Sequence, residues 1–331
     1  MGTRMTSTTV TAARMTCVLS LALPALGAAD GNQFSDWIDP VHLGPIVNSS
    51  ARELGPELSP DGHSRYFASD RPGSVGLDMW VSQRACRHCP WNAPVHLGPN
   101  INSPQSDGGP TFSPDGHLLS ITSDRVDVGA QGGDDIWVSH RKNKRDDFGW
   151  GPPVNLGPDV NTTLHETGPA FLSGRGKRGH HILYFGRGAT LDEFDIYQAA
   201  VTRHGKPLEP GVPVAELNHP TALDGLGDVR AGGRELIFWS TRPGGLGLAD
   251  IWVATRPNIH HPWSTPQNLG VPVNTSFGEL GPRLSSRGGI LFFSATAARG
   301  SLGFQDIWMS TRTRLDHDHD DDDQYGDCDA D

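Results

Sequence analysis

Residues 109–140 read GPTFSPDGHLLSITSDRVDVGAQGGDDIWVSH, and this stretch contains the elements that decide the fold. It opens with Gly109-Pro110, passes through the turn sequence Ser113-Pro114-Asp115-Gly116, continues as an apolar run at Leu118–Thr122 and ends with Asp135-Ile136-Trp137. In such a turn, proline sets the first backbone angle, aspartate caps the turn and glycine takes the left-handed position. The stretch therefore predicts two short strands joined by a tight turn, followed by a third strand that begins at the aspartate.

The same pattern returns along the whole chain. An Asp-apolar-aromatic triplet occurs five times, and successive aspartates are 57, 60, 55 and 56 residues apart. The aspartates are Asp78, Asp135, Asp195, Asp250 and Asp306. A further short segment, such as Pro94-Val95-His96-Leu97-Gly98, links one copy to the next. Each unit offers four short strands separated by turn residues, so the repeat predicts an all-β, five-bladed β-propeller.

The two ends of the repeated region complement each other. The first copy begins with a linking strand around Trp37–Leu43, whereas the last copy stops after the strand at Asp306–Ser310. Pairing these segments would complete the fifth blade, while an open stack of repeats would need capping units at its ends. We therefore expect residues 34–314 to form a ring that is closed by its N- and C-terminal segments.

The Ser-Pro-Asp-Gly turns, the Asp-Ile-Trp strand and the loops Ser69-Asp70-Arg71-Pro72-Gly73 and Ser240-Thr241-Arg242-Pro243-Gly244 resemble the TolB-like, WD-like propeller repeats of bacterial periplasmic proteins. The resemblance covers roughly Trp37 to Arg314. It implies a rigid extracytoplasmic ring that binds a protein or a small ligand near the cell envelope.

The N-terminal residues predict export. Residues 1–29 carry Arg4 and Arg14 before an apolar stretch, Cys17–Leu26, and small residues follow it, as in a cleaved signal peptide. We expect a periplasmic or secreted protein, monomeric and without a membrane span after cleavage.

Residues 315–331 form an acidic tail that should be disordered and bind at most a divalent cation weakly, and no other cofactor is expected. A net charge of −11 argues against nucleic-acid binding.

Cys86 and Cys89 are close in the sequence. In an oxidising compartment they could close a small local disulfide. They could also be free thiols, or belong to a metal or redox site, although zinc would need two further ligands.

A set of acidic residues suggests where a ligand could bind. Each of them stands three residues before the proline of a Gly-Pro pair, and the fourth unit offers Asp224 or Asp228 nearby. With His165, which breaks the repeat, the candidate residues are Glu53, Asp107, His165, Glu166, Asp224 and Glu279. Because the first strand of a blade lines the channel of a propeller, the carboxylates could form a binding ring for a cation or ligand. Alternatively, each carboxylate accepts hydrogen bonds at its own strand start. The motif aspartates should instead bond turn N–H groups, and the aromatic residues after them should pack between blades.

Two functional hypotheses follow. The first is a non-enzymatic binding module for a protein, small molecule or glycan. The alternative is a carbohydrate-active hydrolase that uses carboxylates at the central channel, as five-bladed glycosidases do. No nucleophile elbow, zinc-protease motif or phosphate loop is present, and the near-equivalence of the repeated acids favours binding over catalysis.

Overall fold

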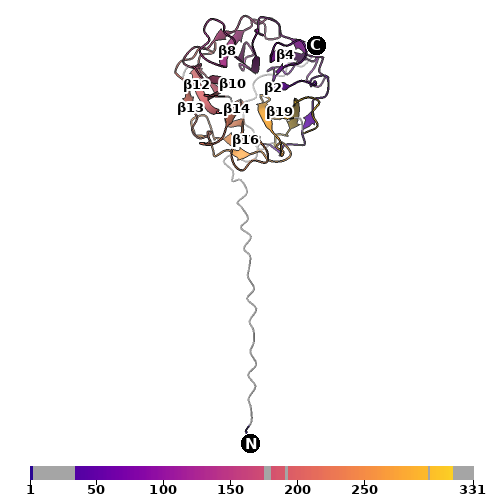
Figure 1. Cartoon of the computed structure of the whole chain (residues 1–331), viewed down its shortest axis with the longest axis vertical. Coiled ribbons are helices and arrows are strands. Elements are labelled where there is room, and N and C mark those ends of the chain that lie inside the picture. The colour runs from indigo at the N-terminus through magenta and orange to yellow at the C-terminus, as the bar shows by residue number, and fades with distance from the viewer. Residues whose placement is uncertain (3–33, 175–179, 191–192, 297–298, 316–331) are drawn as a thin grey trace.

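The computed structural model describes residues 1–2, 34–174, 180–190, 193–296 and 299–315. Within this part of the chain, strands β1–β20 form five four-stranded antiparallel sheets around a common centre (Figure 1). The predicted all-β, five-bladed propeller is confirmed. The predicted signal peptide and acidic tail, apart from residues 1, 2 and 315, lie outside the described residues.

Each of the first four blades is a run of consecutive strands. Blade 1 comprises β2 (Glu53–Leu58), β3 (Ser64–Ser69), β4 (Asp78–Gln83) and β5 (Val95–His96). Blade 2 comprises β6 (Asp107–Phe112), β7 (Leu118–Ser123), β8 (Asp135–His140) and β9 (Val154–Asn155). Blade 3 comprises β10 (His165–Leu172), β11 (His181–Gly188), β12 (Asp195–Val201) and β13 (Val212–Pro213). Blade 4 comprises β14 (Asp224–Val229), β15 (Glu235–Ser240), β16 (Asp250–Thr255) and β17 (Gln267–Asn268).

The fifth blade joins the two ends of the chain. It contains β18 (Glu279–Leu284), β19 (Ile290–Thr296) and β20 (Gln305–Thr311), and its outer strand is β1 (Val41–His42). In the register, Val41 lies opposite Met309 and His42 lies opposite Trp308. The predicted closure of the ring by its terminal segments is confirmed.

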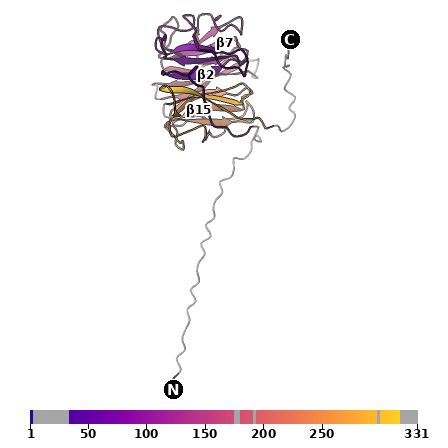
Figure 2. The same cartoon turned by 90° about the vertical axis from the view of Figure 1, so that its right-hand side faces the viewer.

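The first strand of each blade is innermost. In Figure 1 the inner strands β2, β10 and β14 lie around the centre of the disc, and β6 and β18 complete the set. Seen after a 90° turn, the strands run across the thickness of the disc (Figure 2). All five inner strands therefore begin at one face of the ring and end at the other.

A β-bulge interrupts the pairing of the inner strand in every blade. In β2 the bulge lies between Leu54 and Glu57, and Gly55 there has a φ of 56°. A Cβ atom on Gly55 would lie 3.6 Å from the Cα atom of Gly109, so inner strands of neighbouring blades approach closely at this point. Glycine permits both the positive φ and the close approach.

The repeated aspartates hold the loops that precede the third strands. Asp78 accepts a hydrogen bond from the backbone N–H of Val75 at 2.9 Å, and Asp135 accepts one from Gln131 at 2.7 Å. Asp306 accepts one from Gly303 at 3.1 Å. The prediction that the motif aspartates bind backbone N–H groups of adjoining turns is confirmed for these three and for Asp250, whereas no such bond of Asp195 occurs among the described residues. They stabilise local structure.

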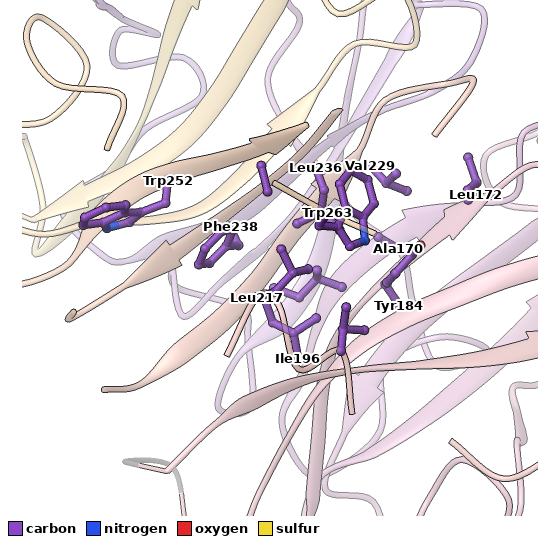
Figure 3. Packing of buried hydrophobic residues seen from close by; sticks show 13 residues of the cluster. Ala170, Leu172, Tyr184, Ile196, Leu217, Val229, Leu236, Phe238, Trp252 and Trp263 are labelled. Atoms are coloured by element: carbon purple, nitrogen blue, oxygen red, sulfur yellow. The ribbon is translucent and has the colours of Figure 1, made fainter. Parts of the chain in front are cut away.

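Apolar side chains of neighbouring blades pack against one another. Figure 3 shows one such cluster, which contains Tyr184 and Ile196 of blade 3 together with Phe238 and Trp252 of blade 4. Burial of apolar surface between the blades thus stabilises their contact, in addition to the backbone connections. The close packing makes the ring a rigid support for side chains near its centre.

Candidate functional site

The repeated acids lie at the N-terminal ends of the inner strands, as the sequence suggested, but their side chains are fully buried. The five residues with no exposed side-chain surface are Glu53, Asp107, Glu166, Asp224 and Glu279. Each accepts a hydrogen bond from the backbone N–H of a residue four or five positions earlier. The fourth unit uses Asp224 in this set, and Asp228 lies elsewhere.

Each of these carboxylates is also paired with an arginine. Asp107 accepts hydrogen bonds from the backbone N–H of Ser103 at 2.5 Å, from its Oγ at 2.8 Å and from Nη2 of Arg125 at 2.5 Å. The five arginines are Arg71, Arg125, Arg187, Arg242 and Arg299. Each guanidinium group also lies over the aromatic ring of the motif on the third strand, as Arg125 lies 5.3 Å from the ring centroid of Trp137. This geometry agrees with the second interpretation of the acids, in which each carboxylate accepts hydrogen bonds at the start of its own strand and so stabilises its own blade.

His165 lies at the same end of the inner strands. Its Nδ1 is 2.9 Å from Oδ2 of Asp134, and its side chain is 29% exposed. Neither His165 nor the five buried acids line the cavity described next. A ligand-binding role for this set stays a prediction without a cavity to support it.

A cavity of about 900 Å³ lies at the opposite ends of the inner strands. Turn residues such as Ser59 and Ser113 surround it, together with the aromatic side chains of Trp91, Phe112 and Phe292. Its volume falls in the range of roughly 300–1,000 Å³ that small-molecule sites occupy. A mainly apolar wall with a few polar groups is typical of a ligand site.

Two carboxylates line this cavity, Glu57 of β2 and Asp228 of β14. They hold the same position of the inner strand, the fifth, in blades 1 and 4. The equivalent residues of blades 2, 3 and 5 are Thr111, Ala170 and Arg283. The inner strands therefore place two acids, one base and two small residues at equivalent points around the axis.

Arg283 connects the two acids. Its Nε is 3.8 Å from Oε2 of Glu57, and its Nη1 donates hydrogen bonds to the carbonyl oxygens of Pro169 and Gly227. Asp228 accepts hydrogen bonds from the backbone N–H groups of Val229 at 2.7 Å and Leu284 at 2.9 Å. These N–H groups favour an ionised Asp228.

The two carboxyl groups have different environments. Burial, with a further contribution from the negative charge of Asp228, raises the pKa of Glu57 to about 8. Burial also raises the pKa of Asp228, and Arg283 and the backbone N–H groups oppose that rise. At neutral pH Glu57 thus retains its proton, and it can donate that proton to a bound ligand.

Sequence periodicity alone would place Glu53 and Glu57 on the same face of their strand, because they are four residues apart. The bulge reverses this relation: Glu53 pairs with Ser69, whereas Glu57 pairs with Tyr66, and these partners point to opposite faces. The sequence did contain one signal for the cavity acids, because the fifth inner position differs in every unit while its surroundings repeat. The pattern of repeated acids presents Asp228 only as a substitute for Asp224, and it does not single out Glu57.

The loop after β4 carries a disulfide between Cys86 and Cys89, whose Cα atoms are 5.0 Å apart. The local disulfide was the first of the interpretations that the sequence offered. Arg84, Arg87 and Trp91 of the same loop line the cavity. The bridge therefore restrains the loop that forms one wall of the cavity.

In the described part of the chain, no group of three or more His, Cys, Asp or Glu side chains is placed to hold a metal ion. Among the same residues, no helix is long and apolar enough to cross a membrane.

Comparisons with known proteins place the fold in context. No protein-family model matches the sequence, and no curated protein matches it. Among solved structures, a thermostable family-43 glycoside hydrolase shares 12% identity over 84% of this chain and 94% of its own, with a TM-score of 0.55. The α-L-arabinofuranosidase PaAbf62A from Podospora anserina, solved with cellotriose, shares 10% identity over 84% and 98%, with a TM-score of 0.53. TolB from Acinetobacter baumannii shares 15% identity over 81% of this chain and 56% of its own, with a TM-score of 0.45.

These matches correct the first functional hypothesis. We expected a non-enzymatic binding module, but the solved structures that share this architecture are mostly glycoside hydrolases. The finding favours the alternative hypothesis of a carbohydrate-active hydrolase. Because the identities are low, the similarity establishes the five-bladed fold, and the chemistry has to be argued from the cavity itself.

Proposed function

We propose that the protein is a glycoside hydrolase whose active site is the cavity at the C-terminal ends of the inner strands, with Glu57 as general acid and Asp228 as the second carboxylate. The observation that carries this proposal is the convergence of two acids, from the same strand position of two non-adjacent blades, on one cavity lined by aromatic side chains. Glycoside hydrolysis uses such a pair of carboxyl groups on either side of the scissile bond.

The two residues have separate tasks in this reaction. Glu57 gives its proton to the glycosidic oxygen as the bond from that oxygen to the anomeric carbon breaks. Asp228 either takes a proton from the attacking water or bonds to the anomeric carbon before water releases the sugar. Their environments support this division, because Glu57 is protonated at neutral pH and Asp228 is bound by two backbone N–H groups.

Arg283 positions the acids. Its side chain is only 3% exposed and its guanidinium group is bound to two backbone carbonyl oxygens, so it cannot move freely toward a substrate. It lies beside Glu57 and limits the rise in the pKa of both carboxyl groups. Without it, the pKa of both carboxyl groups would rise further, and the charged form of the second carboxylate would be less favoured.

The test is hydrolysis of a panel of glycosides, beginning with α-L-arabinofuranosides because the matching structures include enzymes that act on them. Glu57→Gln and Asp228→Asn should each lower turnover by about 10²- to 10⁴-fold, the usual contribution of an acid or base in this position. Glu209→Gln, at an exposed carboxylate away from the cavity, is the matched control and should leave turnover unchanged. Failure to hydrolyse any glycoside, or turnover that survives both cavity substitutions, would contradict the proposal.

The N-terminal signal pattern and the resemblance to TolB-like repeats support a periplasmic or secreted location for this hydrolase. Detection of the mature protein outside the cytoplasm, starting near residue 30, is the measurement that checks it.

A further inference from the structure

Arg65 lines the cavity from β3 and is almost completely buried, with 1% of its surface exposed. Its guanidinium carbon lies 4.3 Å from the ring centroid of Trp91 and 4.2 Å from that of Phe292. No ion pair or side-chain hydrogen bond of Arg65 occurs among the described residues, and its Nε and Nη1 are buried without a partner. A buried guanidinium group in this state is costly for the folded protein unless a ligand satisfies it.

The other blades show that the fold does not need this arginine. Arg65 pairs with the sixth residue of the inner strand, Leu58, and the residues in the same register of the other blades are all leucines: Leu119, Leu183, Leu236 and Leu291. All four leucines are fully buried. Blade 1 thus has a cation at a position where the other four blades have a core leucine. This position lies where the cavity extends between blades 1 and 5.

A second cation, Arg84, lines the same wall of the cavity. Arg84 also lies over Trp91, with its guanidinium carbon 4.3 Å from the ring centroid. At the equivalent end of the third strand, Arg141 pairs with Asp147 and Arg312 pairs with Glu235, whereas Arg256 of blade 4 has no ion pair among the described residues and donates to the carbonyl oxygen of Gly233. Arg84 also has no acid among the described residues, and its Nε donates to the carbonyl oxygen of Gly62. Of these two arginines, Arg84 lines the cavity and Arg256 does not.

The cavity wall therefore holds like charges close together. Burial, with the nearby charge of Arg84, lowers the pKa of Arg65 to about 9, and burial with the charge of Arg87 lowers the pKa of Arg84. Arg65 remains charged at neutral pH, beside the guanidinium group of Arg84. An anion bound among them would reduce the repulsion and supply the missing hydrogen-bond acceptor.

We propose that the cavity takes a glycan that carries an anionic group, either the carboxylate of a uronic acid or a sulfate ester, and that Arg65 and Arg84 bind this group. The proposal rests on the proposed function for the glycan itself, and on the unpaired Arg65 for the anion. The planar fork of a guanidinium group matches two oxygens of a carboxylate or sulfate, and the rings of Trp91 and Phe292 fix its orientation.

The experiment measures binding by titration calorimetry in the Glu57→Gln variant, so that a bound glycan is not consumed. The probes are a galacturonic acid trisaccharide, the neutral galactose trisaccharide of the same linkage, and that neutral trisaccharide carrying one 6-sulfate. At least one acidic probe should bind about tenfold or more tightly than the neutral probe, because charge-assisted hydrogen bonds are strong in a desolvated site. The tighter of the two acidic probes identifies carboxylate or sulfate as the recognised group.

Arg65→Leu in the same background should reduce the ratio of acidic to neutral affinity to about one. Because four blades already place leucine there, this variant should fold, and its melting temperature should equal or exceed that of its parent. Arg65→Met is a second uncharged variant of similar length. Arg145→Leu, which removes an exposed positive charge outside the cavity, is the control and should keep the preference.

Equal affinity for the three probes, or a preference that survives both substitutions of Arg65, would overturn the proposal. Its failure is separable from that of the hydrolase proposal because binding is measured without turnover. A protein that prefers an acidic probe but hydrolyses no glycoside has the anion site and lacks the activity. A protein that hydrolyses neutral glycosides with no preference for acidic ones has the activity and lacks the anion site.

Discussion

Replacement of Asp107 by asparagine tests whether the buried acids support the blades or repel one another. The carboxylate of Asp107 is fully buried, and its closest cation, Nη2 of Arg125, lies 2.5 Å away on a side chain that is 5% exposed. Asp107→Asn keeps the shape and removes the negative charge, which leaves the buried charge of Arg125 with only the exposed Asp127, 3.9 Å away, as an acidic partner. Breaking a buried pair in this way costs about 3–5 kcal/mol of the free energy of unfolding.

The assay is urea unfolding followed by tryptophan fluorescence and circular dichroism. The control is Asp70→Asn, because Asp70 pairs with Arg52 at 2.8 Å but the side chains are 30% and 41% exposed. An exposed pair contributes about 0–1 kcal/mol, so the control should change stability far less. If the five acids instead formed a ring of repelling charges, Asp107→Asn would stabilise the protein. A neutral or stabilising result would refute the paired arrangement.

Two further predictions follow from the cavity and the ring closure. The pKa of Glu57 is raised from 4.5 to about 8 in the folded protein, so the unfolded chain loses this proton at lower pH than the folded protein does. The contribution of Glu57 to the free energy of unfolding should therefore fall as the pH rises from 4.5 to 8 and should not change further above pH 8. Urea unfolding across this range should show a smaller fall for Glu57→Gln, and an identical pH dependence would contradict the assignment. Deletion of residues 34–43 removes β1, which pairs with β20 and contributes the contact of 2.7 Å between His42 and Asp306. The exposed edge of β20 should lower the melting temperature and promote aggregation, measured by calorimetry and light scattering, and an unchanged melting temperature would argue against closure through this strand.

The repeat made the scaffold predictable from the sequence. Turn residues such as Ser113-Pro114-Asp115-Gly116 act within a few positions, and the capping by Asp135 of the loop before its strand is equally local. Because such interactions depend on nearby residues only, five spaced copies suffice to predict the blades, and the incomplete first and last copies predict the closure. The position of the buried acids at the strand starts followed from the same periodicity.

The cavity and its chemistry were decided by the tertiary structure. Glu57 and Asp228 are 171 positions apart in the sequence, and they meet because non-adjacent blades converge on one axis. The bulge in β2 also places Glu57 on the face opposite to Glu53, a reversal that strict alternation cannot supply. Arg65 looks in the sequence like one more charged strand residue, and only the packing of blade 1 against blade 5 buries it between Trp91 and Phe292. Local hydrogen bonds and spacing therefore determine the ring, whereas the meeting of distant side chains, which depends on how the blades pack, determines what the ring can bind.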